Sequence, residues 1–370
     1  MTMANNNDKK VLNVPALRFP EFSGEWKHVH LKEIAEFQKQ RISTALLNNN
    51  NYISTENILQ DFEGIQCSSS MPANVNVIKY QNEDILLSNI RPYLKKVWFA
   101  DRKGGCSADV LVLRGNKCDK YFLYYVIASD RFINYVMSGI KGVKMPRGDK
   151  NQMEEYAFSI PTNMEQKRIA KFISILDERI RLQNKIIEKL QSLIKGITIL
   201  LTTKGEPNTT IAQCLECHSS TLQEREVSHS GLYKVFGANG LLGYTDMPQM
   251  NGDSILIIKD GSGVGTVSYA QGDFSIIGTL NYLTALSNYD VRYLYFVLSV
   301  FNFQSYKTGM AIPHIYFKDY GNAKIYCPPL SEQKRIANVL GKLESKLFLE
   351  QNILVSFNLQ KQYLLHQMFI

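Results

Sequence analysis

The chain has 370 residues, of which 45% are hydrophobic, 11% aromatic and 21% charged. This composition excludes an intrinsically disordered protein, and the length is typical of two or three domains. The net charge of +8 and the pI ≈ 9.0 favour a polyanionic partner such as nucleic acid, with a general solubility bias as the alternative.

The other bulk features favour a cytoplasmic protein without a membrane anchor. The first ten residues contain no apolar run of the kind that a secretory signal needs. No apolar stretch approaches the roughly 18 residues of a membrane span. The nearest one, residues 291–303, contains Arg292. The six cysteines are too sparse for a disulfide scaffold in a chain of this length, which favours a reducing compartment.

The pattern of apolar and turn residues divides the chain into five segments. A polar leader comes first, followed by a segment of short alternating runs that predicts strands with a few helices. A long segment without proline then predicts a helix, and the strand-rich and helical patterns follow once more. The five segments are residues 1–20, 21–161, 162–204, 205–328 and 329–370.

A repeated string explains why the pattern occurs twice. Glu-Gln-Lys-Arg-Ile-Ala stands at Glu165–Ala170 and again at Glu332–Ala337, at an offset of 167 residues. The match continues at the same offset in both directions, with the pairs Gly142 and Gly309, Pro146 and Pro313, Pro161 and Pro328, Ile180 and Leu347, and Ile186 and Ile353. The sequence therefore predicts two copies of one module, each of which ends in a helix.

Each predicted helix carries apolar residues spaced alternately four and three positions apart. Thr162 and Glu165 form a capping-box signal at the start of the first helix. Gln183 interrupts the first apolar seam, and Glu350 and Lys361 interrupt the second. Gln183 and Glu350 are equivalent in the repeat, and one polar residue in such a seam favours a single register.

The simplest arrangement packs the two helices together as an antiparallel coiled coil. The alternative is that each seam binds a different chain. Leu182 and Ile186 widen the first seam and leave apolar surface for a partner. The other candidate interface residues are Ile169, Leu176, Ile180, Ile336, Leu343, Leu347 and Leu354.

One motif resembles a cofactor site. The segment Cys214–His218 matches the haem-attachment pattern C-x-x-C-H, but haem attachment takes place outside the cytoplasm, and zinc would need two more ligands. Alignment of Ile211 with Leu31 in the repeat places the two cysteines on Ile34 and Phe37. Packing in the core is therefore the preferred interpretation, and no metal site is predicted.

A glycine-rich loop and a search for catalytic motifs point away from catalysis. Asp260–Gly265 resembles a phosphate-binding loop, but the following residues continue as a strand, so a hairpin is expected. The chain contains no H-E-x-x-H, no Walker A lysine and no methyltransferase Asn/Asp-Pro-Pro-Tyr/Phe tetrapeptide. We predict no catalytic residue.

Polar and basic clusters at matching positions of the two modules suggest binding instead. Hydroxyl, amide and basic side chains hydrogen-bond base edges and phosphates. Loops that correspond in position but differ in residues suit two readers of different sequences, whereas solvated charged loops are the alternative. The candidates are Ser88, Asn89, Arg91, Lys95, Lys96, Lys144 and Arg147 in the first module, and Lys259, Asp260, Ser262, Lys307, His314 and Tyr316 in the second.

Taken together, these segments resemble the specificity subunits of type I restriction-modification systems. The resemblance covers nearly the whole chain. It rests on the two Pro-x-x-x-Glu-Gln-Lys-Arg-Ile-Ala segments and on five further stretches: Val14–Trp26, Tyr52–Asn57, Glu83–Ser88, Tyr233–Gly240 and Gly252–Leu256. It implies an α+β fold, with two tandem strand-rich α/β target-recognition domains that are separated and followed by two long helices packed as an antiparallel coiled coil.

The resemblance also implies a function and partners. Each domain would read one half of a split duplex DNA sequence, and the helices would act as a ruler that holds the domains roughly one DNA turn apart. Two modification subunits would supply S-adenosylmethionine-dependent adenine methylation, and two restriction subunits would supply ATP- and Mg-dependent translocation and cleavage. This chain itself would bind no cofactor. The rivals are a stand-alone duplex-DNA-binding regulator and an enzyme with an unrecognised site.

The candidate residues divide into two expected roles. Asn89, Arg91, Lys259 and the loop around His314 are expected to discriminate bases, and Asp260 suits a cytosine amino group. Contacts to phosphates are expected from Lys95, Lys96, Lys144, Arg147 and Lys307.

Overall fold

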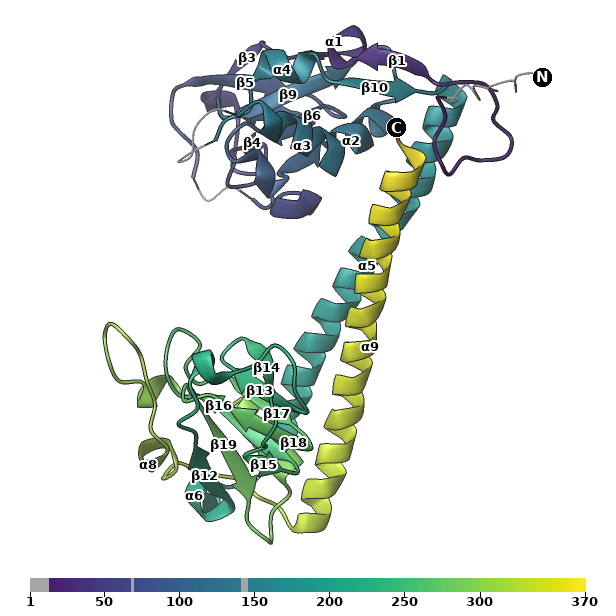
Figure 1. The fold of residues 1–370 in the computed structure, drawn as a ribbon. Helices are drawn as coiled ribbons and strands as arrows, with labels where there is room; N and C mark the ends of the chain where they lie inside the picture. The colour runs from purple at the N-terminus through teal and green to yellow at the C-terminus, as the bar shows by residue number, and fades with distance from the viewer. Residues whose placement is uncertain (1–12, 68–69, 141–145) are drawn as a thin grey trace, which may run out of the picture. The chain divides into compact units, whose positions relative to one another are not determined.

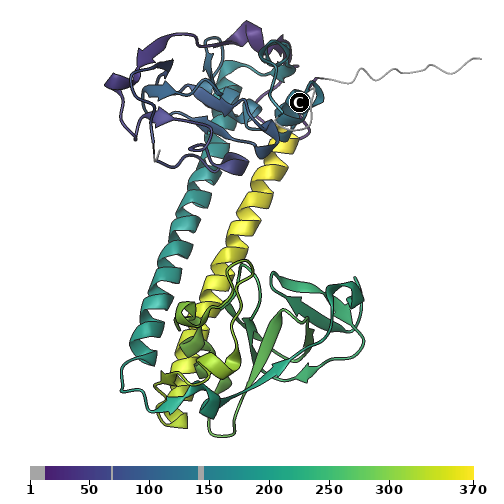
Figure 2. The same ribbon diagram turned by 90° about the vertical axis from the view of Figure 1, so that its left-hand side faces the viewer.

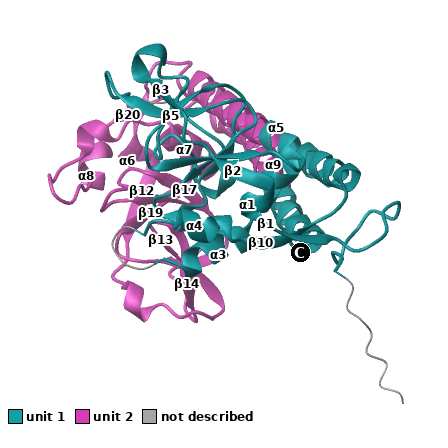
Figure 3. Ribbon diagram, turned by 90° about the horizontal axis from the view of Figure 1, so that it is seen from above, with its two compact units in different colours: residues 1–182, 355–370 teal, residues 183–354 magenta. Residues whose placement is uncertain are grey.

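A computed structural model describes residues 13–67, 70–140 and 146–370 of the chain. The chain forms two compact units, shown in two colours in Figure 3. Unit 1 contains residues 1–182 and 355–370, and unit 2 contains residues 183–354. The boundaries fall inside two long helices, α5 (Asn163–Thr202) and α9 (Leu330–Met368), so that each unit includes part of both.

Unit 1 combines two four-stranded sheets, a two-stranded ribbon and short helices. The strand orders are β2-β9-β6-β7, β3-β5-β8-β4 and β1-β10. The strands are β1 (Lys27–His30), β2 (Ala35–Phe37), β3 (Arg41–Ser43), β4 (Tyr52–Ile53), β5 (Asn76–Tyr80), β6 (Ile85–Ser88), β7 (Val97–Phe99), β8 (Gly104–Cys106), β9 (Val110–Gly115) and β10 (Ala157–Ile160). The helices are α1 (Leu31–Ile34), α2 (Lys120–Ile127), α3 (Asp130–Ser138) and α4 (Lys150–Glu154).

Unit 2 is built in the same way. Its strand orders are β12-β19-β16-β17, β14-β13-β18-β15 and β11-β20. The strands are β11 (Thr209–Thr210), β12 (Leu215–Ser219), β13 (Tyr233–Gly237), β14 (Gly240–Thr245), β15 (Met250–Asn251), β16 (Ser254–Ile258), β17 (Val267–Ala270), β18 (Asp273–Ile276), β19 (Leu280–Ala285) and β20 (Lys324–Ile325). The helices are α6 (Ile211–Cys214), α7 (Val291–Ser299) and α8 (Phe317–Tyr320).

The sheets show which parts of the duplicated module are common and which differ. The order β2-β9-β6-β7 recurs as β12-β19-β16-β17. In the other sheet, the parallel pair β4 and β8 followed by antiparallel β5 corresponds to parallel β13 and β18 followed by antiparallel β15. The edge strands differ, because β3 adds to β5 in unit 1 whereas β14 adds to β13 in unit 2. The predicted duplication and the α+β class are thus confirmed.

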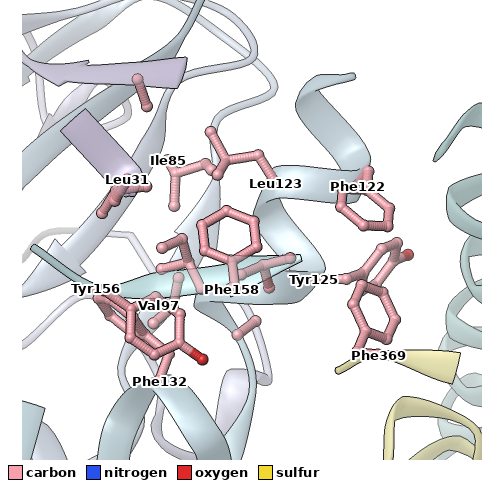
Figure 4. Close-up of a cluster of buried hydrophobic side chains, with 14 of the residues drawn as sticks. Leu31, Ile85, Val97, Phe122, Leu123, Tyr125, Phe132, Tyr156, Phe158 and Phe369 are labelled. Atoms are coloured by element: carbon pink, nitrogen blue, oxygen red, sulfur yellow. The ribbon is translucent and has the colours of Figure 1, made fainter. Parts of the chain in front are cut away.

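The end of α9 and the two residues that follow it complete the core of unit 1. Phe369 stacks on Phe122 with ring centroids 5.1 Å apart, and Arg131 donates to the Phe369 carbonyl at 2.9 Å. Leu364 and Met368 are buried in the same cluster, part of which Figure 4 shows. In unit 2, the end of α5 packs against the core in the corresponding way, through Ile197 and Leu201. Each long helix therefore ends in the core of a unit.

The beginning of α5 is attached to unit 1 by a buried glutamine. The side chain of Gln166, which is 3% exposed, donates to the Pro161 carbonyl at 2.9 Å and accepts from the Asp119 amide at 2.8 Å. Asp119 is the N-cap of α2, so that one amide group joins the starts of two helices. The neighbouring Glu165 forms an ion pair with Arg18 at 2.7 Å, and this contact takes the place of the reciprocal half of the predicted capping box.

The same attachment recurs at the start of α9. Gln333 donates to the Pro328 carbonyl at 2.8 Å and accepts from the amide of Asp290, the N-cap of α7, at 2.9 Å. Glu332 pairs with Lys204 of the linker, just as Glu165 pairs with Arg18. The repeated six-residue string is therefore the sequence of a domain–helix junction.

The two long helices pack together in antiparallel fashion, as predicted (Figures 1 and 2). The start of α5 shares a core with the end of α9 in unit 1, where Ile169 and Leu364 are both buried. The end of α5 packs with the start of α9 in unit 2, where Ile197 lies against the cluster that contains Ile336. The alternating apolar spacing thus forms contacts within the chain.

The polar residues that interrupt the seam all have partners. Gln183 donates to the Glu350 carboxylate at 2.5 Å and to its backbone carbonyl at 3.0 Å. Lys346 pairs with the same carboxylate at 2.5 Å, and the hydrogen bonds from Lys346 and Gln183 lower the pKa of Glu350. Lys361 forms an ion pair with Asp177 at 2.6 Å. The two residues predicted to be equivalent in the seam thus contact each other, and their register-fixing role stays a prediction.

The buried glutamine predicts a specific loss of stability. Gln166→Ala leaves the buried Pro161 carbonyl and the partly buried Asp119 amide without these partners. We expect it to lower the free energy of unfolding of unit 1 by about 1–3 kcal/mol. Gln360→Ala, on the exposed face of α9 in the same unit, is the matched control and should change it by less than about 0.5 kcal/mol. Urea unfolding followed by circular dichroism measures both. Equal effects of the two variants would contradict the proposed junction.

Candidate nucleic-acid interface

The two candidate clusters of the first module meet in the structure. After β6, the backbone runs beside the Gly/Pro segment that precedes α4. Arg91 donates from its backbone amide to the Pro146 carbonyl at 2.8 Å, and Gly148 donates to the Asn89 carbonyl at 3.1 Å. This short ladder brings Arg147 next to the Asn89–Arg91 turn. Both the Arg91 and the Arg147 side chains are exposed.

The same ladder exists in unit 2 with different side chains. Gly261 donates to the Pro313 carbonyl at 2.9 Å, and Ile315 donates to the Lys259 carbonyl at 3.0 Å. His314 and Tyr316 therefore lie beside the Lys259–Gly261 turn, with the His314 and Tyr316 rings 4.9 Å apart. In both units, residues from distant parts of the sequence form one composite loop surface. We call the surfaces around Asn89–Arg91 and Lys259–Gly261 the reading surfaces of units 1 and 2, after the role proposed for them below.

The reading surface of unit 1 has free and partnered groups. Arg147 forms an exposed ion pair with Asp109 at 3.1 Å, which a stronger anion can displace because such pairs contribute little. The Asn89 side-chain oxygen is buried and accepts no hydrogen bond from the described residues. Arg91 is not part of any ion pair within the described ranges. Among the first-module candidates in the described residues, the two guanidinium groups are thus the most available for an external partner.

Three other candidates of the first module already have partners. Ser88 is buried and donates to the Ile90 carbonyl at 2.9 Å. Lys96 donates to the Thr55 carbonyl at 2.8 Å, and Lys95 pairs with Asp130 at 2.8 Å. A DNA contact by any of them stays a prediction that competes with these bonds. Lys144 lies outside the described residues.

The second module presents its candidates around a β-hairpin. Strands β16 and β17 pair in antiparallel fashion, so the Asp260–Gly265 loop is the hairpin expected from the sequence, with Ser262 exposed at its turn. Lys307 precedes Thr308, whose backbone pairs with that of His314 in both directions, at 2.9 and 2.8 Å. Lys318 lies over the Tyr316 ring, at 5.3 Å from its centroid.

A pocket of about 310 Å³ opens in the reading surface of unit 2. Its volume is at the lower end of the range of about 300–1,000 Å³ that is typical of small-molecule sites. Sequence reasoning found Lys259, Asp260 and Tyr316 among its lining residues but missed Ser219, Asn281 and Lys318. Asn281 offered one signal, because it is a polar residue at an inward-facing position of β19, between the apolar residues Leu280 and Leu283.

The cysteine motif does not build a metal centre. Cys214 is fully buried, with its sulfur 3.9 Å from that of Cys327, and burial raises the pKa of Cys217 to about 11. Within the described ranges, no group of three or more His, Cys, Asp or Glu side chains could hold a metal ion. Nor does any helix in that part of the chain combine the length and apolar character needed to cross a membrane.

The long helices keep apolar side chains exposed on their outer faces. Leu182 and Ile186 of α5 are 46% and 44% exposed, as the widened seam predicts. On α9, Phe348 and Leu349 are 62% and 56% exposed and line a second pocket with Glu344. By contrast, Ile169, Leu176 and Ile336 are buried, so these candidate interface residues pack inside the chain.

The backbone at Arg91 differs from what its residue type prefers. Arg91 has φ = 49°, in the left-handed region, where unit 2 has Gly261 with φ = 98°. A residue with a Cβ pays roughly 1–2 kcal/mol there, whereas glycine does not. Strain of this kind is often retained where a side chain is needed for function.

Arg91→Gly therefore has a predictable effect on stability. We expect it to raise the free energy of unfolding of unit 1 by up to about 1 kcal/mol, because glycine removes the strain at a small cost in chain entropy. Arg91→Ala keeps the Cβ and is the control, with a change below about 0.5 kcal/mol. Chemical denaturation distinguishes the two. Equal stabilisation by both variants would assign the effect to the lost charge and contradict backbone strain.

The structural class is that of a protein with two duplicated α+β units joined by paired antiparallel helices. Comparison with known proteins identifies the family. The model of the type I restriction modification DNA specificity domain matches residues 23–192 and 212–356. The match spans well over half of the chain, which therefore belongs to this family.

Curated relatives and solved structures agree with this assignment. The specificity subunit of the type I restriction enzyme MjaVIII from Methanocaldococcus jannaschii is 30% identical over 199 residues, which are 51% of this chain and 44% of that protein. The EcoprrI specificity subunit of Escherichia coli is 23% identical over 124 residues, 34% of this chain and 30% of its own length. The matched regions thus span less than half the length of these relatives.

The fold is that of two solved type I structures. The S subunit of the type I restriction-modification system from M. genitalium superposes with a TM-score of 0.66 at 18% identity, covering 96% of this chain and 99% of that one. A chain from a study of complex assembly and conformational transition of the type I R-M system gives a TM-score of 0.55 at 18% identity, covering 92% and 96%. At these identities the likeness concerns the fold alone.

Proposed function

We propose that this chain reads a split duplex DNA sequence, one half with each unit, as the specificity subunit of a type I restriction-modification complex. The observation that carries the proposal is the pair of reading surfaces. The same backbone ladder, from Arg91 to Pro146 and from Gly261 to Pro313, presents different side chains in the two units. A common scaffold with different recognition groups is what two readers of different half-sites need.

The chemistry of unit 1 suits a guanine-containing half-site. Arginine donates two parallel hydrogen bonds to guanine O6 and N7 in the major groove, and this is the commonest base-specific contact. Arg91 is exposed and held at a fixed point of a backbone turn. Arg147 lies beside it and is available for a second base or for a phosphate.

The chemistry of unit 2 is mixed. Lys259 offers a donor, Asp260 an acceptor for an amino group, and His314 a group that can donate or accept. Lys307 and Lys318 flank this surface and suit phosphates, which position the duplex without reading its sequence. We assign contacts to phosphates to Lys144 as well, because it belongs to the basic Gly/Pro segment of the first module that also contains Arg147.

The helices suit protein partners. Exposed apolar residues on α5 and α9, including Leu182, Ile186 and Phe348, form surface that water does not favour. We propose that this surface binds two modification subunits, and through them two restriction subunits. S-adenosylmethionine, ATP and Mg would then be bound by those partners, and this chain would contribute recognition without catalysis.

Selection from random duplex DNA tests the function directly. We expect the purified chain, together with a co-purifying methyltransferase partner, to select two short blocks separated by a fixed unread gap. The chain alone serves as the control for the contribution of the partner. One continuous motif, or no motif even with the partner, would contradict bipartite reading and favour the rival regulator.

The two expected residue roles can be separated on the selected duplex. We expect Arg91→Ala to relax one base position in one half-site, at a cost of about 1–3 kcal/mol for the preferred base. Lys307→Ala should weaken all sequences alike and reduce the salt dependence by about one phosphate contact. Binding measured at several salt concentrations on matched and substituted duplexes reports both effects. A change of sequence preference in Lys307→Ala would overturn the assignment.

A further inference from the structure

The pocket in unit 2 has a polar floor built on a sheet. Leu283, Ile255 and Ile257 face the core from β19 and β16. Further along the same face, the inward positions become polar, with Ser219 opposite Asn281 in the strand register and Lys259 following β16. An apolar sheet face thus ends in a cluster of hydrogen-bonding groups, at the point where the pocket opens.

Asn281 lines the pocket with one side-chain amide atom that has a partner and one that has none among the described residues. Its residue exposure is 6%, and its side-chain oxygen accepts from the Ser219 hydroxyl at 2.8 Å. The amide nitrogen of the same side chain donates no hydrogen bond to any described residue, although Asn281 lines the pocket. This nitrogen is not one of the fully buried polar atoms that lack a partner among the described residues, so it is open to a ligand that accepts from it.

Unit 1 fills the same place with apolar side chains. The strand register aligns Cys217 with Phe37, because each pairs with the leucine that faces the core on the next strand. It likewise aligns Asn281 with Leu111, which packs against the core of unit 1. Phe37 is only 8% exposed. The pocket therefore arises from replacement of large apolar residues by small and polar ones at equivalent positions of a shared fold.

We propose that this pocket binds a single nucleobase, which makes it a base-reading subsite of unit 2. Asn281 and Lys259 supply donors for ring nitrogens or carbonyl groups, and Asp260 accepts from an exocyclic amino group. Tyr316 supplies an aromatic surface against which a base can stack. An isolated phosphate fits less well because of the Asp260 carboxylate, and an apolar ligand would leave all these groups without partners.

The depth of the pocket restricts how a base reaches it. Bases in a closed duplex are recessed between the two backbones, whereas Asn281 lies at a pocket floor with 6% exposure. A base in the duplex must therefore turn out of the stack to contact it, which costs a few kcal/mol and costs least at a mismatched pair. A free nucleotide has the same recognition chemistry and is the other source. The proposal that the base comes from a DNA duplex rests on the function proposed above.

The experiment uses the full chain, with its partner, on the selected duplex. Single mismatches are scanned across the half-site read by unit 2, each keeping the preferred base on one strand. We expect one position at which a mismatch strengthens binding by about tenfold, because the cost of unpairing has been removed. Asn281→Leu, which introduces the residue of unit 1, should abolish this gain and the preference at that position. The preferences of the other half-site should not change.

Two further measurements keep the test decisive. Asn281→Asp preserves the shape of the side chain and turns its donor into an acceptor, so it should change the preferred base rather than abolish preference. Titration of the chain with each nucleoside monophosphate, followed by tyrosine fluorescence, reports the free source and needs no DNA target. Saturable binding that Asn281→Leu abolishes supports a nucleobase pocket even if DNA selection yields no motif.

The failures are also distinguishable. Absence of a split motif contradicts the proposed function alone. A split motif without any mismatch gain, together with no nucleotide binding, overturns the pocket proposal and leaves bipartite reading intact. A mismatch gain that persists in Asn281→Leu likewise overturns it, provided that circular dichroism shows the variant to be folded.

Discussion

One buried side-chain amide in each module attaches the strand-rich part of the module to its long helix. Gln166 and Gln333 each join the start of a short helix to the start of a long one, through one donated and one accepted hydrogen bond. Only an amide side chain of this length offers both groups at once, because a carboxylate has no donor and an apolar side chain has neither group. The geometry of each junction is therefore fixed by groups that cannot rearrange without leaving buried backbone unpaired.

In the seam between α5 and α9, one residue that differs between the two copies makes the contact between equivalent positions favourable. In an antiparallel pair of repeated helices, equivalent residues meet near the crossing point, and Gln183 indeed contacts its equivalent Glu350. Two glutamates at this point would repel each other. A glutamine on one helix and a glutamate on the other provide a donor and an acceptor, and Lys346 balances the remaining charge. A single difference between the copies thus makes the contact favourable.

The features that depend on local pattern were predictable from the sequence. The duplication, both helices, the antiparallel seam and the hairpin at Asp260–Gly265 follow from spacing and turn residues. The meeting of Asn89–Arg91 with Arg147 was not predictable, because it depends on a backbone ladder between distant segments. Residue type also did not reveal that Ser88 and Lys96 direct their polar groups to backbone carbonyls. Residues 329–370 were predicted as one spacer helix from their pattern, which did not reveal that Phe369, just beyond the end of α9, packs in the core of unit 1.

The pocket in unit 2 could not be predicted from the sequence, and it shows how the two modules differ. Sequence identity between the copies is lost along the strands, so that the equivalence of Asn281 and Leu111 emerges only from strand register. On the same ladder, unit 1 places a large side chain at a left-handed position, Arg91, where unit 2 has Gly261. Unit 1 thus presents a projecting guanidinium above a filled sheet face, and unit 2 presents a recess beside a glycine turn. A projecting group can enter a groove, whereas a recess can receive a group from it. Under the proposed function, one backbone scaffold would therefore support two different ways of reading a half-site.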